Sequence, residues 1–262
     1  MLQSAKAVVV VVVLCGAPLR AAEPATLTWC GHACFVLQTP TLRVLLDPLS
    51  ADLGLPMPAA AVDVDVVTIS HAHPDHANVA LAGGTPRVLR GVDGAGRVRP
   101  IDEVIQGVRI RSVAVFHDAE GGKRRGNNAI FVVEWGGRRL VHVGDLGHTL
   151  SAAQLQAIGD VDDLLLPVGG VWTLPPAAAV QLIAQLRPRR TILPMHYGIA
   201  GRNKFKLQPL ADFLALLAAS DPAAPTPQTL ASSALVLDDG PVPAAPALWL
   251  LALPADAAPP SK

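Results

Sequence analysis

A run of apolar and β-branched residues that ends in a dense cluster of metal-ligand side chains constrains this chain most. Residues 64–69 read Val-Asp-Val-Val-Thr-Ile and predict a buried strand. Directly after it, His71, His73, Asp75 and His76 place three imidazoles and a carboxylate within six positions. Imidazole nitrogen and carboxylate oxygen are the atoms that bind Zn²⁺ and similar divalent ions. This loop therefore predicts a metal site at the end of a strand.

The clustering of histidine supports this interpretation. The chain has 8 histidines in 262 residues, and three of them fall in this one short loop. A single histidine is more often a surface or hydrogen-bonded residue than a ligand, but such a grouping is improbable by chance. In an irregular loop, His71 and His73 can turn to one side while Asp75 and His76 turn to the other. That arrangement suits two metal ions held side by side.

Three further candidate ligands follow predicted strands. His117 follows residues 107–115, Asp145 follows residues 139–143, and His196 follows residues 191–194. The end of a strand is a rigid position from which a side chain can keep a fixed direction. The combined set suits two metal ions, one held by His71, His73 and His117, the other by Asp75, His76 and His196, with Asp145 shared between them.

In this order, the motifs resemble those of the metallo-β-lactamase-fold hydrolases. The resemblance rests on the His-Ala-His-Pro-Asp-His loop, the later His117, the Gly-Asp145 turn and the Pro-Met-His196-Tyr segment, and it extends from residue 26 to about residue 240. Trp-Cys-Gly-His-Ala at 29–33, Leu-Asp-Pro at 46–48 and Pro-Val-Gly-Gly at 167–170 make the chain most similar to one branch. That branch contains the L-ascorbate-6-phosphate lactonase and related uncharacterised hydrolases. The resemblance implies an α/β fold, a four-layer αβ/βα sandwich with metals in a cleft at one edge of two sheets.

The predicted activity is that of a dinuclear metal-dependent hydrolase. A metal-bound hydroxide would cleave a lactone, a phosphoester or an amide-type bond. The resemblance gives Asp75 a catalytic role, which is to orient the hydroxide and pass a proton to the leaving group. Two divalent ions are expected, with Zn²⁺ first and Mn²⁺ or Fe as alternatives, because such ligand sets accept several metals. A non-catalytic metal-binding member of the same fold and an exported β-lactamase-like enzyme remain open alternatives.

Two residues are candidates for a place behind the ligands. His32 could support a ligand or face the substrate. It is about equally expected to be an ordinary histidine in a turn. Asp47 could orient a ligand histidine or cap a strand end.

Charge composition limits the partners. Lys and Arg together number 21, as do Asp and Glu, so the net charge is zero. A nucleic-acid binder needs a basic surface to neutralise phosphates, and therefore no nucleic-acid partner is expected. A small-molecule substrate is expected, anionic if Arg124, Arg125 and Lys123 steer it. The resemblance also permits a homo-oligomer.

The chain divides into three predicted parts. Residues 1–22 resemble a signal peptide, with Lys6 before an apolar run and Ala21-Ala22 for cleavage. Residues 23–240 form the hydrolase domain, and residues 241–262 form a Pro/Ala-rich tail. The apolar run is shorter than the roughly 20 residues of a membrane span, so no stable span is expected after signal removal. These features predict export to the periplasm or the medium. A membrane-anchored lipoprotein with lipid on Cys15 is the less favoured alternative, because the bulky Leu14 precedes this cysteine.

Overall fold

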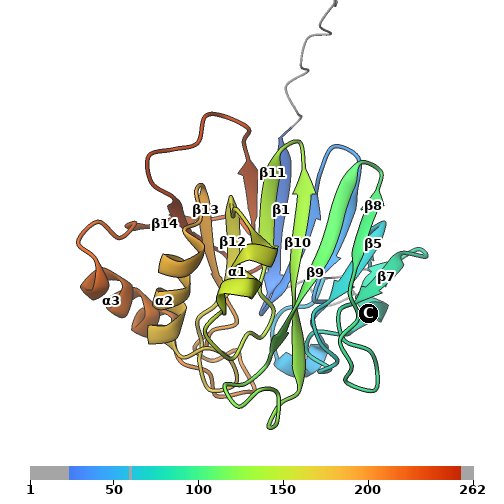
Figure 1. Cartoon of the computed structure of the whole chain (residues 1–262), viewed down its shortest axis with the longest axis horizontal. Coiled ribbons are helices and arrows are strands. Elements are labelled where there is room, and N and C mark those ends of the chain that lie inside the picture. The colour runs from blue at the N-terminus through green and yellow to red at the C-terminus, as the bar shows by residue number, and fades with distance from the viewer. Residues whose placement is uncertain (1–23, 59–60, 255–262) are drawn as a thin grey trace, which may run out of the picture.

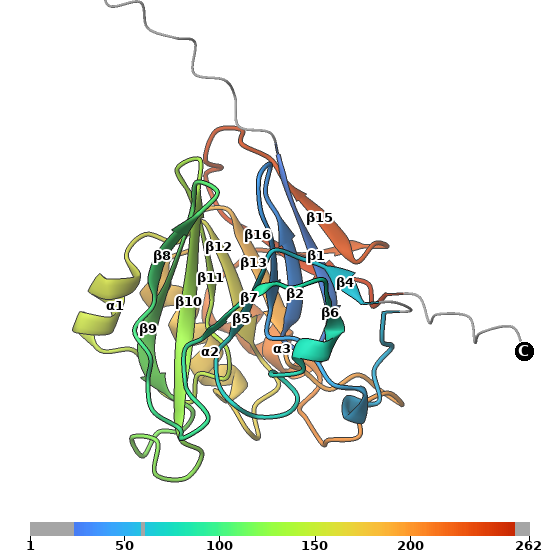
Figure 2. The same cartoon turned by 90° about the vertical axis from the view of Figure 1, so that its right-hand side faces the viewer.

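The computed structural model describes residues 24–58 and 61–254. The predicted signal peptide lies outside these described residues. Within the described part, two β-sheets face each other, and Figure 2 shows them from the edge with α1 and α2 outside the larger sheet. The predicted α/β sandwich is confirmed. No helix in the described ranges is long and apolar enough to cross a membrane.

The smaller sheet has six strands in the order β15-β1-β2-β3-β5-β7. β1, β2 and β3 form an antiparallel meander, and β5 and β7 join it in parallel. The strands are β1 Ala25–Gly31, β2 Cys34–Gln38, β3 Arg43–Leu46, β5 Val66–Ile69, β7 Arg87–Arg90 and β15 Ala234–Leu237. The strand that leads into the histidine loop, β5, is therefore an interior strand with neighbours on both sides.

The larger sheet has eight strands in the order β14-β16-β13-β12-β11-β10-β9-β8 (Figure 1). It is antiparallel from β8 to β11 and parallel from β11 onward. The strands are β8 Asp102–Ile105, β9 Val108–Phe116, β10 Asn127–Trp135, β11 Arg138–His142, β12 Asp163–Pro167, β13 Thr191–Met195, β14 Pro227–Leu230 and β16 Ala247–Leu251. A small separate pair consists of β4 Val62–Asp63 and β6 Ala82–Gly83.

The C-terminal segment departs from the sequence prediction. Residues 241–262 are predicted as a tail, but residues 247–251 form β16, which lies between β13 and β14. Leu248 on this strand is fully buried. Residues 220–229, which resemble a linker, contain the start of β14. The boundary expected at residue 240 is therefore too early, because the hydrolase domain continues through β16.

Apolar side chains fill three layers. One layer lies between the sheets and includes Phe35 and Phe131. A second lies between the larger sheet and three helices, which are α1 Ala152–Ile158, α2 Pro176–Leu186 and α3 Leu210–Ser220. The third covers the outer face of the smaller sheet with short 3-10 turns, η1 Ala51–Leu53 and η2 Val79–Leu81. Because the central strands are covered on both faces, they are almost continuously apolar.

The loops with candidate ligands leave the two sheets at one edge. β11, β12 and β13 run parallel, and β9 shares their direction because it pairs antiparallel with β10, which pairs antiparallel with β11. The ends of β9, β11 and β13 therefore meet at the same edge. His117 directly follows β9, and His196 directly follows β13. Asp145 lies three residues after the end of β11. The fold accounts for the gathering of side chains that lie far apart in the sequence.

Candidate metal centre

Three histidines form the first group of side chains. His71, His73 and His117 each offer a ring nitrogen, and these atoms lie within 4.8 Å of one another. His71 Nε2 is 3.0 Å from His73 Nδ1. His71 and His117 are buried, whereas His73 is exposed. The group therefore sits at the bottom of an opening to solvent.

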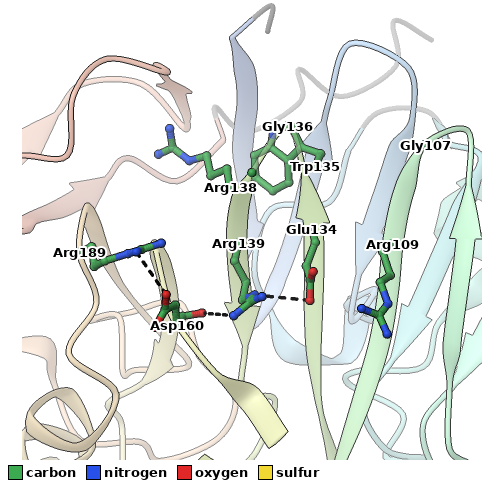
Figure 3. A pocket seen from close by; sticks show the side chains of 10 residues that line it. Gly107, Arg109, Glu134, Trp135, Gly136, Arg138, Arg139, Asp160 and Arg189 are labelled. Carbon is green, nitrogen blue, oxygen red and sulfur yellow. Dashed lines mark hydrogen bonds and ion pairs between the residues drawn. The ribbon is translucent and has the colours of Figure 1, made fainter. Parts of the chain in front are cut away.

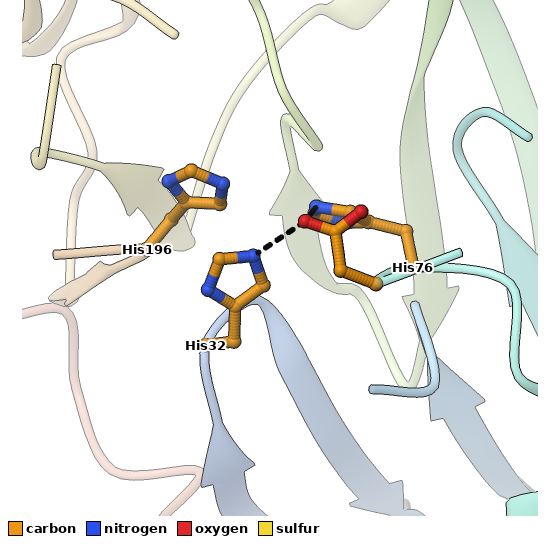
Figure 4. A group of neighbouring side chains, drawn as sticks. His32, His76 and His196 are labelled. Carbon is orange, nitrogen blue, oxygen red and sulfur yellow. Dashed lines mark hydrogen bonds and ion pairs between the residues drawn. The ribbon is translucent and has the colours of Figure 1, made fainter. Parts of the chain in front are cut away.

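A second group lies beside it and contains one more member than the sequence predicts. Asp75, His76 and His196 are joined by His32, again with ligand atoms within 4.8 Å of one another. His32 Nε2 is 3.2 Å from Asp75 Oδ2, and His76 Nε2 is 3.6 Å from the same oxygen. Figure 4 shows the rings of His32, His76 and His196 converging on one space. His32, which the sequence leaves open as a supporting, substrate-facing or ordinary turn residue, thus lies within the group itself.

Asp145 stands between the two groups. Its Oδ2 is 3.2 Å from His117 Nε2, on one side, and 3.3 Å from His196 Nε2, on the other. Its Oδ1 is 3.3 Å from His76 Nε2. The carboxylate is buried, and its Oδ1 has no hydrogen-bond partner among the residues that the structure describes. This is the placement expected of a carboxylate shared by two metal ions.

The donor atoms suit cations. Several of the atoms that face the cluster are buried without a hydrogen-bond partner: Nε2 of His76, Nε2 of His117 and Oδ1 of Asp145. An unpartnered buried polar atom costs about 1–3 kcal/mol, so such a concentration needs a compensating partner. Nitrogen and oxygen donors in this number are what Zn²⁺, Mn²⁺ or Fe takes. The residues therefore fit a pair of divalent ions.

The pKa shifts of Asp145, His71 and Asp75 agree with this fit, whereas burial acts to lower the pKa of His76 but the adjacent Asp145 and Asp47 outweigh it and hold that pKa well above its ordinary value. Burial acts to raise the pKa of Asp145, but the adjacent His196 and His76 outweigh it and hold that pKa well below its usual range. Burial also lowers the pKa of the His71 ring well below its ordinary value. For Asp75, the hydrogen bond from His32 overcomes the effect of burial and lowers the pKa. Ionised carboxylates and a neutral imidazole are the forms that bind a metal.

Asp47 supports the ligands from behind. It is fully buried, and its Oδ2 lies 3.0 Å from His76 Nδ1. It also accepts hydrogen bonds from Ser70, through the backbone N–H at 2.7 Å and the hydroxyl at 2.5 Å. A carboxylate on the far nitrogen of a ligand histidine fixes the ring and its tautomer. The structure therefore places Asp47 where it can orient a ligand histidine, as the sequence suggests.

Two supporting residues are not apparent from the sequence. The hydroxyl of Ser70 is 2.9 Å from His71 Nδ1, so it links Asp47 to a second ligand. Asn128 accepts a hydrogen bond from the Asp145 N–H at 3.2 Å and donates to the Val143 carbonyl at 2.9 Å. Ser70 directly precedes the histidine loop, which is a weak signal. Asn128 has no local signal, because its role depends on the pairing of β10 with β11.

Two glycines let the ligand loops approach each other. Gly144 has a φ of +56°, and a Cβ there would lie 2.6 Å from Asn128 Oδ1. At Gly169, a Cβ would lie 2.1 Å from the His196 carbonyl oxygen. A side chain at either position would displace a loop that carries a candidate ligand.

A cavity of about 180 Å³ opens over the two groups. Its polar wall consists of candidate ligands, and its remaining wall consists of Trp172, Phe205 and Leu207. The basic loop of residues 123–125 does not line this cavity. Arg125 instead lies over the Trp172 ring, 4.4 Å from its centroid.

A second cavity, of about 340 Å³, lies at the opposite edge of the larger sheet (Figure 3). Arginines line it, but they are paired with carboxylates. Arg189 Nη1 is 3.3 Å from Asp160 Oδ2, and Arg139 Nε is 3.4 Å from Glu134 Oε1. Paired charges of this kind are a common surface arrangement. The histidine and aspartate cluster is therefore the candidate active site.

The sandwich of two sheets and its cluster of His and Asp at one edge define the class as metal-dependent hydrolases of the metallo-β-lactamase superfamily. Residues 26–196 match the profile of the beta-lactamase superfamily domain, so the chain belongs to that family.

Curated relatives and solved structures agree. A metal-dependent hydrolase of Anaeromyxobacter sp. (strain K) is 32% identical over 213 residues, which cover 69% of this chain and 77% of the relative. One from Methanoregula boonei is 32% identical over 205 residues, with 69% and 87% covered. A Thermotoga maritima structure described as a zinc-dependent hydrolase of the superfamily has a TM-score of 0.66 at 33% identity, covering 87% of this chain and 98% of that one. The metallo hydrolase Igni18 of Ignicoccus hospitalis shares the fold, with a TM-score of 0.55 at 22% identity, over 76% of this chain and 92% of its own.

Proposed function

We propose that this chain is a dinuclear hydrolase of a small-molecule lactone, phosphoester or amide. His71, His73 and His117 would hold one divalent ion, Asp75, His76 and His196 would hold the other, and Asp145 would be shared. The observation that carries the proposal is the position of Asp145, whose carboxylate contacts histidines of both groups at 3.2 and 3.3 Å. We expect Zn²⁺, with Mn²⁺ or Fe as alternatives.

The residues of the second group would also serve the reaction. Bound here, two divalent ions would lower the pKa of water and polarise the scissile bond. Asp75 and Asp145 both line the cavity, and Asp75 is the more accessible carboxylate, since its side chain is 26% exposed whereas that of Asp145 is 3% exposed. It can take a proton from the attacking water and deliver it to the leaving group. The 3.2 Å contact with His32 would help to hold the Asp75 carboxylate in place.

The cavity supports a catalytic site rather than a site that only binds metal. Candidate ligands from both groups, among them His73, Asp75 and His117, line an open space large enough for a small substrate. A metal that only stabilises a fold is normally enclosed by its ligands, without an open position. Export and a homo-oligomeric state remain predictions from the sequence and are independent of this proposal.

The test combines metal content with hydrolysis. Purified protein would be measured for bound metal and assayed on a lactone, a phosphodiester and a β-lactam, together with His71→Ala and Asp145→Ala. His148→Gln is the matched control, because its ring contacts Phe116 N and the Thr149 carbonyl rather than the cluster. We expect about two ions per chain and hydrolysis of one compound, with both lost only in the two ligand variants.

Each other outcome has a distinct meaning. Absence of metal, or full activity in His71→Ala, would refute the dinuclear centre. Two ions without hydrolysis of any compound would favour the non-catalytic alternative. Hydrolysis of the β-lactam alone would favour the β-lactamase-like alternative.

A further inference from the structure

The cavity above the metal centre has two chemically different walls. One wall consists of candidate metal ligands, and the other consists of Trp172, Phe205 and Leu207. Among the described residues that line the cavity, none is Lys or Arg. Resting on the proposed function, we infer that the substrate presents an uncharged apolar group, aromatic or branched, beside its scissile bond. A substrate with a phosphate away from that bond does not fit this wall.

The aromatic side chains are exposed at the place where a ligand would cover them. Trp172 is 45% exposed and Phe205 is 44% exposed, although most large apolar side chains of the described chain are buried. They come from two different loops, one between β12 and α2 and one between β13 and α3, and both line the same cavity. Exposed aromatic surface that converges on a cavity with a few polar groups is typical of a small-molecule site.

The orientation of Trp172 is enforced by the neighbouring backbone. Val171 has a φ of +59°, a left-handed conformation that a β-branched residue rarely adopts. Its side chain is 52% exposed, so packing of that side chain does not account for the strain. Backbone strain of this kind persists where the surrounding structure imposes it, and it concentrates at ligand sites.

Two contacts hold this strained turn in place. Gln208 N–H donates to the Gly169 carbonyl at 2.7 Å, which ties the Trp172 loop to the loop that contains Phe205. The guanidinium of Arg125 stacks on the Trp172 ring and donates to the Val171 carbonyl at 3.3 Å. The two aromatic side chains are therefore presented together, as one apolar wall.

The charges near the cavity argue against a phosphorylated substrate. The Arg125 guanidinium is engaged with the Trp172 ring and the Val171 carbonyl and is not part of the cavity lining. The lining contains the carboxylates of Asp75 and Asp145, which the proposed function assigns to the metal ions, and no Lys or Arg side chain. A phosphate remote from the scissile bond and held against the aromatic wall would have no cationic partner among the lining residues, and it would lose its hydration there.

The preference for an apolar group can be tested with three lactones that differ in one substituent. They are γ-butyrolactone, its γ-phenyl derivative and its γ-phosphooxymethyl derivative. We expect kcat/KM of the metal-loaded enzyme for the phenyl compound to exceed that for the parent by roughly tenfold or more, as one well-filled apolar pocket provides. The phosphorylated compound should be the poorest. In Trp172→Ala and Phe205→Ala the preference for phenyl over the parent should fall, and Trp172→Phe should retain part of it. Val104→Ala, which removes a 69% exposed side chain on β8, is the control and should keep the full preference.

A binding measurement separates this inference from the proposed function. Phenylacetate and acetate, which share the carboxylate of a hydrolysis product, would be titrated into the metal-loaded protein by calorimetry. Tighter binding of phenylacetate that is lost in Trp172→Ala supports the apolar wall even if no lactone is hydrolysed. Equal binding of the two acids, or a preference for the phosphorylated lactone, overturns the inference. Either result can occur while two ions and hydrolysis of the parent lactone uphold the proposed function.

Discussion

The substitution Asp47→Asn should weaken the metal site more than it weakens the fold. The carboxylate of Asp47 accepts hydrogen bonds from the Ser70 N–H, the Ser70 hydroxyl and the His76 Nδ1–H, at 2.7, 2.5 and 3.0 Å. An amide keeps an acceptor for the Ser70 N–H, and the hydroxyl can rotate to accept from its NH₂ group. His76 has no such freedom. To accept from the amide, its neutral ring must carry the proton on Nε2 instead of Nδ1.

That change removes a metal-binding lone pair. His76 Nε2 faces Asp145 Oδ1 at 3.3 Å and Asp75 Oδ2 at 3.6 Å, so it is the nitrogen directed into the second group. Loss of such a supporting partner typically lowers metal affinity by about 10- to 100-fold. This corresponds to about 1.4–2.8 kcal/mol for the ion held by His76. The ion held with His71 should be affected less, because Asp47 reaches that histidine only through the Ser70 hydroxyl.

The assay is a metal competition titration against a chelating indicator, alongside urea unfolding. Asp162→Asn is the matched control. Asp162 is equally buried, but it accepts from the Arg139 N–H and contacts Arg189 at the opposite edge of the sheet. The control should lose stability without losing metal affinity, and Asp47→Asn should lose affinity for one ion of the two. Unchanged affinity for both ions in Asp47→Asn would refute the tautomer argument.

Three further predictions test other contacts. Gly169→Ala should lower the free energy of unfolding by about 1–3 kcal/mol in urea, because its Cβ would meet the His196 carbonyl oxygen at 2.1 Å. Gly94→Ala, which meets nothing within 4 Å, should be close to neutral; equal effects would contradict the packing argument. Burial acts to raise the pKa of Asp118, but four backbone N–H groups outweigh it and lower that pKa. Its stabilisation is therefore complete above about pH 4 and lost as the pH falls through the folded-state pKa, so Asp118→Asn should flatten the acid side of a plot of Tm against pH. Burial lowers the pKa of His32 to about 3, so the metal-free protein should lose stability as the pH falls from about 6.5 toward 3. Asn tolerates the φ of +52° at this position, so His32→Asn should reduce the dependence of stability on pH. Urea unfolding of both proteins at pH 7 and pH 5 measures this dependence. If it is unchanged in His32→Asn, other groups cause the loss of stability.

Much of the cluster could be predicted from the sequence, because its members are marked by local signals. His71, His73, Asp75 and His76 lie in one short segment, and the other candidate ligands each follow an apolar strand. Strand direction then determines that these ends meet at one edge. The prediction required only residue types and their positions after apolar strands, whereas the order and direction of the strands come from the structure.

His32 could not be assigned in this way. Its sequence context is a hairpin turn, in which a histidine is unremarkable. Its place in the second group depends on a bulge in β1 between Trp29 and Gly31, on its own φ of +52°, and on a contact with Asp75, 43 residues away. The His32 carbonyl also accepts from the His196 N–H at 3.1 Å, which joins the hairpin to the end of β13. Each of these features is a property of the assembled sheets and not of the local sequence.

The hydrolase domain extends past residue 240 because β16 depends on a distant strand, and β16 also matters to the site. A short apolar segment after a Pro/Ala-rich stretch carries no local signal for a strand, since strand formation depends on a neighbour. The neighbour is β13, more than 50 residues earlier, whose Thr191 and Ile192 pair with Ala247 and Leu248. Without β16, β13 would be an edge strand with one row of backbone groups unpaired. Because His196 follows β13 immediately, the C-terminal strand helps to fix the direction of a candidate ligand, although no residue of β16 lies in the cluster.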